Sequence, residues 1–191
     1  MRKMMGSARR VGTLERHLRP STTLAPSAHL LSRGYAAATG GASQPMWKKV
    51  RITAAGTGMR TVAKEEGEGH EVVMDEPQKM GGTDTGATPL HTLLASLAGC
   101  EHATAMLLAR QMKIKLDSIT FDIEGDYDVR GFRGVEGVPA RYQTVRVKAL
   151  VKTDAPQEKV DELAHLVHKK CPVAALFHDA GVQMDVSWTK V

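Results

Sequence analysis

Two cysteines, Cys100 and Cys171, are the side chains with the clearest capacity for chemistry in this chain of 191 residues. A cysteine acts as a nucleophile only as a thiolate, which requires a nearby positive charge or the first turn of a helix. Because the two lie 71 residues apart, they form no CxxC motif, and only the fold can bring them together. A free cysteine also fills a core as a small apolar residue, and both interpretations stay open at this point.

The first cysteine lies inside a segment with helical periodicity. Thr88 is a candidate N-cap and Pro89 suits the first turn, and leucines and alanines then recur at helical spacing as far as Ala109. Few residues of this segment are charged, so we expect a helix that is buried on most sides, at the centre of the fold or of a dimer. Cys100 is about three turns from the helix start. The helix dipole fades within the first turn, so activation requires a side chain from elsewhere, most plausibly an arginine.

The second cysteine directly precedes Pro172, and a proline interrupts a helix. Val160, Leu163 and Val167 give the preceding segment an apolar face, and Asp154 is its candidate N-cap. Cys171 therefore stands at a junction between two helical segments.

Strand patterns surround these helices. Alternating or β-branched stretches predict six strands, at 47–52, 59–63, 69–75, 119–123, 144–151 and 182–188. Three glycines within 81–86 predict a loop before the first helix. The order of strands, helix, strands, helix and strand indicates an α+β domain.

The first 35 residues differ in charge from the rest of the chain. They hold seven of the 26 Lys/Arg residues and one of the 21 Asp/Glu residues, which gives this segment a formal charge of +6. The remaining 19 basic and 20 acidic residues leave the body at −1, which argues against a nucleic-acid-binding surface. No run of 18 or more apolar residues is present, which argues against a membrane-spanning helix.

An Arg-rich leader that is nearly free of acids is typical of a mitochondrial transit peptide. We therefore predict a transit peptide over 1–35, a linker over 36–45, a folded domain over 46–191 and a location in the mitochondrial matrix. The alternatives are a chloroplast address, or a tail without an address on a cytoplasmic protein.

Several motifs together resemble the OsmC/Ohr family (osmotically inducible protein C and organic hydroperoxide resistance protein). They are the glycine-rich loop 81–86, a helix opened by Pro89, a cysteine eleven positions after that proline, and Cys171-Pro172 further on. The stretch 69–77 resembles the OsmC-like branch of the family, and the resemblance spans about residues 46–190, nearly all of the predicted domain.

This resemblance implies an intertwined homodimer in which curved antiparallel sheets wrap around two central helices. It also implies a cysteine-based thiol peroxidase that reduces organic hydroperoxides and hydrogen peroxide in oxidative-stress defence. Cys100 matches the peroxidatic thiol, Cys171 the resolving thiol, and Arg60 best matches the arginine that holds the thiolate. The reductant would be a dithiol such as a lipoyl group, and we expect no cofactor, metal, nucleic acid or membrane partner.

One position departs from the family pattern. Peroxidase members usually carry a Glu directly after the helix-opening proline, where this chain has Leu90, which accepts no hydrogen bond through its side chain. His91 and His102 are possible polar substitutes, whereas Glu101 lies about 100° around the helix from Cys100. The alternative function is therefore an OsmC-fold binding or stress-associated protein without peroxidase turnover.

A metal site is a further alternative for the polar residues near this helix. The spacing of His70, His91, Cys100 and His102 matches no zinc signature, so we expect no metal there.

Overall fold

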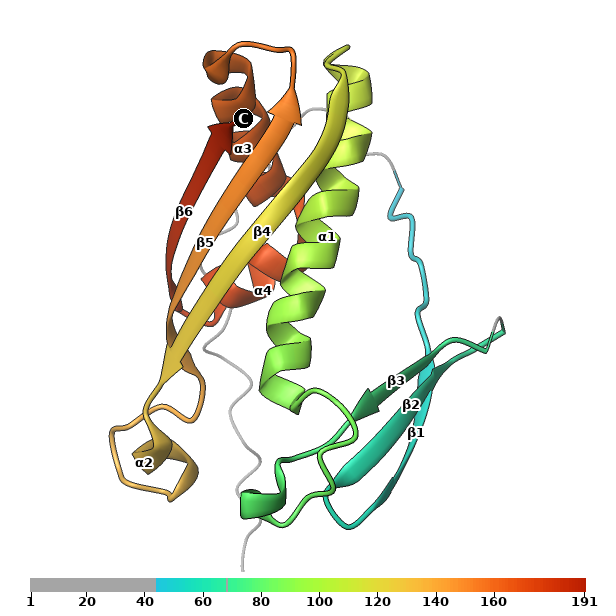
Figure 1. The fold of residues 1–191 in the computed structure, drawn as a ribbon, viewed down its shortest axis with the longest axis vertical. Coiled ribbons are helices and arrows are strands. Elements are labelled where there is room, and N and C mark those ends of the chain that lie inside the picture. Colours follow the sequence, from blue (N-terminus) through green and yellow to red (C-terminus); the bar gives the residue numbers. More distant parts are fainter. Residues whose placement is uncertain (1–43, 68) are drawn as a thin grey trace, which may run out of the picture. The chain divides into compact units, whose positions relative to one another are not determined.

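A computed structural model describes residues 44–67 and 69–191 of the chain. Its elements, in order, are β1 (Ile52–Thr57), β2 (Arg60–Glu65), β3 (Glu71–Met74), the 3-10 turn η1 (Gln78–Met80), α1 (Pro89–Gln111), β4 (Leu116–Tyr127), α2 (Val129–Phe132), β5 (Tyr142–Thr153), α3 (Gln157–Lys170), α4 (Pro172–Asp179) and β6 (Gln183–Lys190) (Figure 1). The fold is α+β, as predicted. The predicted transit peptide and most of the predicted linker lie outside the described residues.

The C-terminal sheet has the strand order β4-β5-β6. β4 and β5 pair antiparallel, with Ile123 opposite Val147, but β5 and β6 pair parallel, with Val147 opposite Val186. The expectation of purely antiparallel sheets is therefore wrong for this pair. Helices α3 and α4 form the crossover that returns the chain to the starting end of β5, and such a crossover produces parallel strands (Figure 1).

The edge strand β6 is fastened at its C-terminal end. The side chain of Gln157, at the start of α3, donates to the carbonyl of Trp188 at 2.9 Å and accepts from the backbone N–H of Lys190 at 2.8 Å. The N–H of Val191 donates to the carbonyl of Val151 at 2.9 Å. The last residues of the chain thus complete the sheet and hold the first turn of α3.

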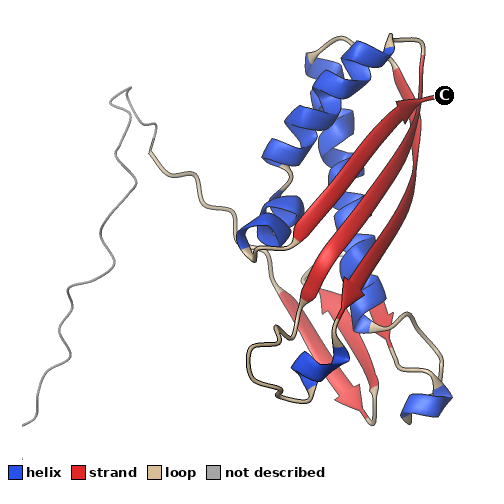
Figure 2. Ribbon diagram, turned by 90° about the vertical axis from the view of Figure 1, so that its left-hand side faces the viewer, coloured by secondary structure: helices blue, strands red, loops and turns tan. Residues whose placement is uncertain are grey.

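Helices α1, α3 and α4 cover one face of this sheet (Figure 2). The alternation in β5 turns every second residue toward them, and these inward residues are buried as the sequence predicts. The apolar face predicted for α3 is likewise buried. Together they build the core, which includes Val145, Val147, Ala149, Val151, Val160, Leu163 and Val167.

Helix α1 begins as predicted, with Thr88 Oγ1 accepting from the N–H of His91 at 3.4 Å. Burial on most sides is wrong within one chain, because α3, α4 and β4 cover only one face of the helix. On the uncovered side Leu93 is 42% exposed and Leu107 is 61% exposed. By length and composition alone α1 could cross a membrane, but here its covered face packs into the protein core.

The N-terminal sheet has the order β1-β2-β3, with both pairs antiparallel. The first strand runs from Ile52 to Thr57, so the prediction of a strand over 47–52 is wrong. The physical reason is the tight turn at Gly58 and Met59, where Gly58 has a φ of 61°. This turn pairs Thr57 with Arg60 and sets the register back to Ile52.

The start of α3 differs from the prediction. Its N-cap is Pro156, which makes no side-chain cap hydrogen bond, so Asp154 is not the cap. The junction predicted at Cys171 is confirmed, because that residue ends α3 and caps α4.

Candidate active site

The fold brings Cys100 and Cys171 together. Cys100 lies in the middle of α1, and Cys171 lies where α3 stops and α4 begins against α1. Both are free thiols, and Cys100 is close enough to Cys171 to raise the pKa of its thiol. Two cysteines that sequence separates by 71 residues are thus neighbours in space.

The two thiols have unequal surroundings. Cys171 has no exposed surface, whereas Cys100 is partly exposed. Burial, together with the adjacent Cys100 thiol, raises the pKa of the Cys171 thiol to about 11. At neutral pH Cys171 is therefore the protonated partner and Cys100 the accessible one.

Cys171 also has a structural task. Its Sγ accepts from the backbone N–H of Ala174 at 3.5 Å, which caps α4. Pro172 occupies the first position of α4, where its missing N–H is not needed. The Cys-Pro sequence thus ends one helix, starts the next and fixes the cysteine against α1.

Glu101, next to Cys100, points into the core instead of toward solvent. It is 1% exposed, and its Oε2 has no hydrogen-bond partner among the described residues. Burial raises the pKa of this carboxyl to about 7. A buried carboxyl group with a raised pKa is not what residue type predicts, and no sequence pattern indicates a role for Glu101.

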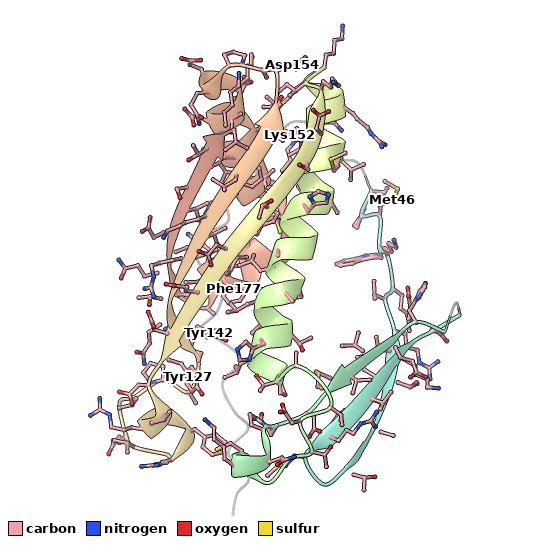
Figure 3. All side chains as sticks on the ribbon, viewed as in Figure 1. Met46, Tyr127, Tyr142, Lys152, Asp154 and Phe177 are labelled. Atoms are coloured by element: carbon pink, nitrogen blue, oxygen red, sulfur yellow. The ribbon has the colours of Figure 1, made fainter. Side chains whose placement is uncertain are left out.

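An apolar pocket of about 260 Å³ lies beside the Cys171–Pro172 junction, between the start of α1, α4 and the beginning of β5. Its lining residues are Leu90, Leu93, Ala140, Arg141, Tyr142, Val173, Leu176, Phe177, Ala180 and Val182. Tyr142 braces it, because its ring lies 6.3 Å from that of Phe177 and 5.9 Å from that of Tyr127 (Figure 3). Its hydroxyl donates to the carbonyl of Leu90 at 3.1 Å, which ties the start of α1 to β5.

The predicted activating residue, Arg60, lies elsewhere. It opens β2, and its Nε donates to Thr85 Oγ1 at 3.1 Å. In the described part of the single chain no hydrogen bond or ion pair joins Arg60 to Cys100 or Cys171. One protomer therefore brings the two thiols together but not the arginine.

The loop that holds Arg60 is organised by Asp75, which the sequence analysis missed. Asp75 is 0% exposed, and its carboxylate accepts from the N–H and hydroxyl groups of both Thr83 and Thr85 and from the N–H of Glu76. These hydrogen bonds, that of the Thr83 hydroxyl first, hold the pKa of Asp75 well below its usual range. The sequence signal is faint: an Asp after a strand, then Thr-x-Thr eight residues later.

The glycines of this loop are required by close approach. A Cβ on Gly82 would lie 1.8 Å from the carbonyl oxygen of Glu76, and a Cβ on Gly86 would lie 2.6 Å from that of Val73. Only glycine lets the loop lie this close to the end of β3. The glycine-rich motif thus places Thr83 and Thr85 around Asp75.

The remaining candidates fall into two groups. Leu90 lines the apolar pocket, and His91 hydrogen-bonds through Nδ1 to Thr88 Oγ1 at 2.7 Å at the start of α1. No group of three or more metal-binding side chains occurs in the part of the chain that the structure describes. Neither His70 nor His102 therefore joins such a group there.

Two neighbouring thiols, one on α1 and one at the α3–α4 junction, and a glycine-rich loop ahead of α1 thus lie in one α+β fold. The family model for OsmC-like protein matches residues 82–187, which is more than half of the chain. The chain belongs to the OsmC-like protein family, as the sequence motifs predicted.

Solved structures share the fold. An OsmC-like protein from Mycoplasma pneumoniae is 23% identical, with a TM-score of 0.63 over 76% of this chain and 99% of its own. An organic hydroperoxide resistance protein from Elizabethkingia anophelis is 18% identical, with a TM-score of 0.61 over 78% of this chain and 100% of its own. An organic hydroperoxide resistance protein OsmC from Legionella pneumophila is 16% identical, with a TM-score of 0.57 over 76% and 99%. No curated protein is significantly similar in sequence.

Proposed function

We propose that this protein is a dimeric cysteine-based peroxidase that reduces organic hydroperoxides with a dithiol. The observation that carries the proposal is the proximity of Cys100 on α1 to Cys171 at the α3–α4 junction. Two structural relatives are named as organic hydroperoxide resistance proteins, which supports the same substrate class.

The chemistry follows from the two thiols. The Cys100 thiolate attacks one peroxide oxygen, the O–O bond breaks, and the other oxygen leaves with a proton as an alcohol. Cys100 is then a sulfenic acid. The Cys171 thiol condenses with it, so that an S–S bond forms and water leaves with the thiol proton. A dithiol, of lipoyl type in this proposal, restores both thiols by exchange and is itself oxidised to a disulfide.

The unequal burial of the thiols supports the order in which the proposal uses them. Cys100 is partly exposed and can meet a peroxide, whereas Cys171 is fully buried and protonated at neutral pH. A sulfenic acid at Cys100 would form directly beside Cys171, so condensation requires little movement. Cys100 is therefore the peroxidatic residue and Cys171 the resolving residue.

The apolar pocket between the start of α1, α4 and the beginning of β5 supports an organic rather than an inorganic peroxide. Leucine, valine and aromatic side chains of α1, α4 and β5 line it, and Arg141 is its one charged lining residue. An alkyl or aryl substituent would displace water from this surface. Leu90 then contributes to substrate binding in place of a carboxylate.

A second copy of the chain would cover α1 and complete the site. On the open side of α1, Ala95, Gly99 and Ala103 allow close helix approach, and Leu93 and Leu107 expose apolar surface. In this proposal Arg60 reaches Cys100 from the partner subunit. Leu107→Glu, a charge on that face, is expected to give a monomer by light scattering, whereas an unchanged dimer would contradict this interface.

Mitochondrial localisation remains part of the proposal and rests on the composition of residues 1–35. A fusion of residues 1–40 to a fluorescent reporter is expected to enter mitochondria. A reporter that stays cytosolic or enters chloroplasts would refute the matrix address.

The main experiment follows the loss of cumene hydroperoxide with dihydrolipoate as the reductant. Cys100→Ser is expected to reduce the rate to background, and Cys171→Ser to lower steady-state turnover at least about tenfold. A single-turnover sulfenic acid should still form in Cys171→Ser. Equal background rates in the wild type, Cys100→Ser and Cys171→Ser would refute the peroxidase proposal. The alternative, an OsmC-fold binding protein without turnover, would then remain.

The pocket is tested by filling its rim. Ala180→Phe places a ring at the pocket edge, and we expect kcat/KM for cumene hydroperoxide to fall about tenfold while that for hydrogen peroxide changes less than about twofold. Ala175→Phe is the matched control, because Ala175 is also exposed on α4 but does not line this pocket. Equal losses with both peroxides would contradict the substrate pocket.

A further inference from the structure

Arg60 is held at one nitrogen. Its Nε donates to Thr85 Oγ1 at 3.1 Å, and in residues 44–67 and 69–191 this is the hydrogen bond that its side chain makes. The two terminal nitrogens of the guanidinium remain available for another group. An arginine fixed at Nε keeps its planar fork in one orientation, whereas an unheld arginine samples many rotamers.

The hydroxyl of Thr85 is itself fixed. Its Oγ1 lies 2.9 Å from Asp75 Oδ2 and 3.3 Å from Thr83 Oγ1. A guanidinium only donates hydrogen bonds and an ionised carboxylate only accepts them. Thr85 must therefore accept from Arg60 and donate to Asp75, so the hydroxyl proton points along one direction.

Asp75 gives this arrangement a rigid base. It is 0% exposed, and the backbone N–H groups of Glu76, Thr83 and Thr85 all donate to its carboxylate. The loop cannot shift toward it, because Gly82 already lies against the backbone of Glu76. A buried carboxylate, a hydroxyl and a guanidinium are thus connected in series.

We infer that Asp75, acting through Thr85, is the positioning group for Arg60 and performs the task that the side chain of Leu90 does not perform. The inference rests on the proposed function, in which Arg60 holds the Cys100 thiolate. The side chain of Leu90 lines an apolar pocket, and its carbonyl is already occupied by the Tyr142 hydroxyl. The acidic group of the site has therefore moved from the start of α1 to the end of β3.

The hydrogen bonds from Arg60 to Thr85 and from Thr85 to Asp75, called the relay below, make Thr85 a positioning residue whose hydroxyl matters more than its shape. Removing the hydroxyl frees Arg60 at Nε but leaves the guanidinium charge in place. The loss should therefore appear in the protonation behaviour of Cys100. Serine keeps the hydroxyl and should restore the wild-type behaviour.

The experiment measures the rate constant for alkylation of Cys100 by iodoacetamide between pH 5 and 9, in the full-length dimer with Cys171→Ser as the background. Thr85→Val and Arg60→Ala are each expected to move the midpoint of the rate profile upward by at least about half a pH unit. The double variant should move it no further than Arg60→Ala does. Thr85→Ser should return the midpoint to the background value.

Thr83→Val is the matched control. Thr83 donates to the same Asp75 oxygen but makes no hydrogen bond with Arg60, so its loss should leave the midpoint unchanged. If Thr85→Val does not fold, Thr85→Ala removes the same hydroxyl with a smaller side chain. A midpoint that stays at the background value in Thr85→Val or Thr85→Ala, or in Arg60→Ala, would overturn the inference, and so would an equal shift in Thr83→Val.

Peroxide turnover is measured separately on the same variants with Cys171 restored. Shifted alkylation profiles without turnover in the wild type would refute the proposed peroxidase and leave the relay standing. Turnover in the wild type with unshifted profiles would refute the relay and leave the peroxidase standing.

Discussion

Asp75 and Glu101 are both almost completely shielded from solvent, but the regions around them treat a carboxyl group in opposite ways. In the loop after β3, five donors surround Asp75 and hold its pKa well below the usual range. In the core between α1 and its neighbours, Oε2 of Glu101 has no partner among the described residues, and burial raises its pKa to about 7. The loop therefore favours the ionised form of its carboxyl group, and the core favours the protonated form.

The difference separates burial from desolvation. Exposure of 0% and 1% would suggest similar environments, but hydrogen-bond donors replace water at Asp75, whereas no donor of residues 44–67 or 69–191 reaches Oε2 of Glu101. The polar loop can therefore carry a fixed anion that orients Arg60. The helical core instead holds, one residue from Cys100, a carboxyl group whose pKa burial raises to about 7.

Replacing Asp75, the buried anion of the loop after β3, should have the largest effect on stability. Asp75→Asn keeps the size of the side chain but turns one acceptor into a donor that faces the Thr83 and Thr85 donors. Several buried donors then lose their partner, so we expect Tm to fall by about 15 °C at pH 7. Calorimetry measures this, and a Tm within about 3 °C of the wild type would show that the loop does not depend on the charge.

Replacing the acid of the core should stabilise the protein, but only where the wild type must ionise. The pKa of Glu101 is raised from 4.5 to about 7, so the folded state binds the extra proton and stability falls as pH rises from about 4.5 to 7. Glu101→Gln has no such loss. Relative to the wild type it should gain up to about 3 kcal/mol above pH 7 and nothing of this kind below pH 4.5.

Urea unfolding at pH 4.5, 6 and 8 measures that gain. Glu101→Leu is a useful companion, because it also removes the ionisation while leaving no polar atom in the core. If the free energy difference between Glu101→Gln and the wild type is the same at all three pH values, Glu101 is not a desolvated acid.

Removing one of the hydrogen-bond donors around Asp75 should have a smaller effect on Tm. Thr83→Val removes one hydroxyl donor from Asp75 but leaves the Thr83 N–H and both Thr85 donors in place. We expect Tm to fall by about 3 °C. A drop as large as that of Asp75→Asn would mean that the hydrogen bonds act as one unit rather than in parallel.

An exposed carboxylate should matter least. Glu71 on β3 pairs with Lys64 of β2 at 2.6 Å, but the two side chains are 45% and 58% exposed. Water screens this pair, so Glu71→Gln should change Tm by less than about 1 °C. A clear loss of stability would show that contact alone, without burial, makes a carboxyl important here.

Periodic segments of the fold could be predicted from the sequence. The helix that begins at Pro89, the alternation in β5 and the break at Cys171-Pro172 depend on local spacing, and the structure confirms all three. Direction of pairing was not predictable in the same way. The parallel β5–β6 pair depends on how α3 and α4 cross over, which no local pattern encodes.

The site shows the same division. Cys100 and Cys171 were identifiable as residue types and by motif, and the fold places them in contact. The roles of Asp75 and Glu101 depend on the number of donors that reach each carboxyl, which is set by tertiary structure. Residue type alone predicts an exposed, ionised group for both.

The fastening of β6 has a consequence for biosynthesis. This strand is translated after the strand it pairs with, and Gln157 and Val151 complete their hydrogen bonds only when Trp188, Lys190 and Val191 are available. Until then β5 presents an unpaired edge with alternating buried valines, which is the kind of surface that recruits other strands. Until β6 is in place, this edge is open to strands of other chains, and removal of residues 183–191 should leave it open permanently and promote aggregation.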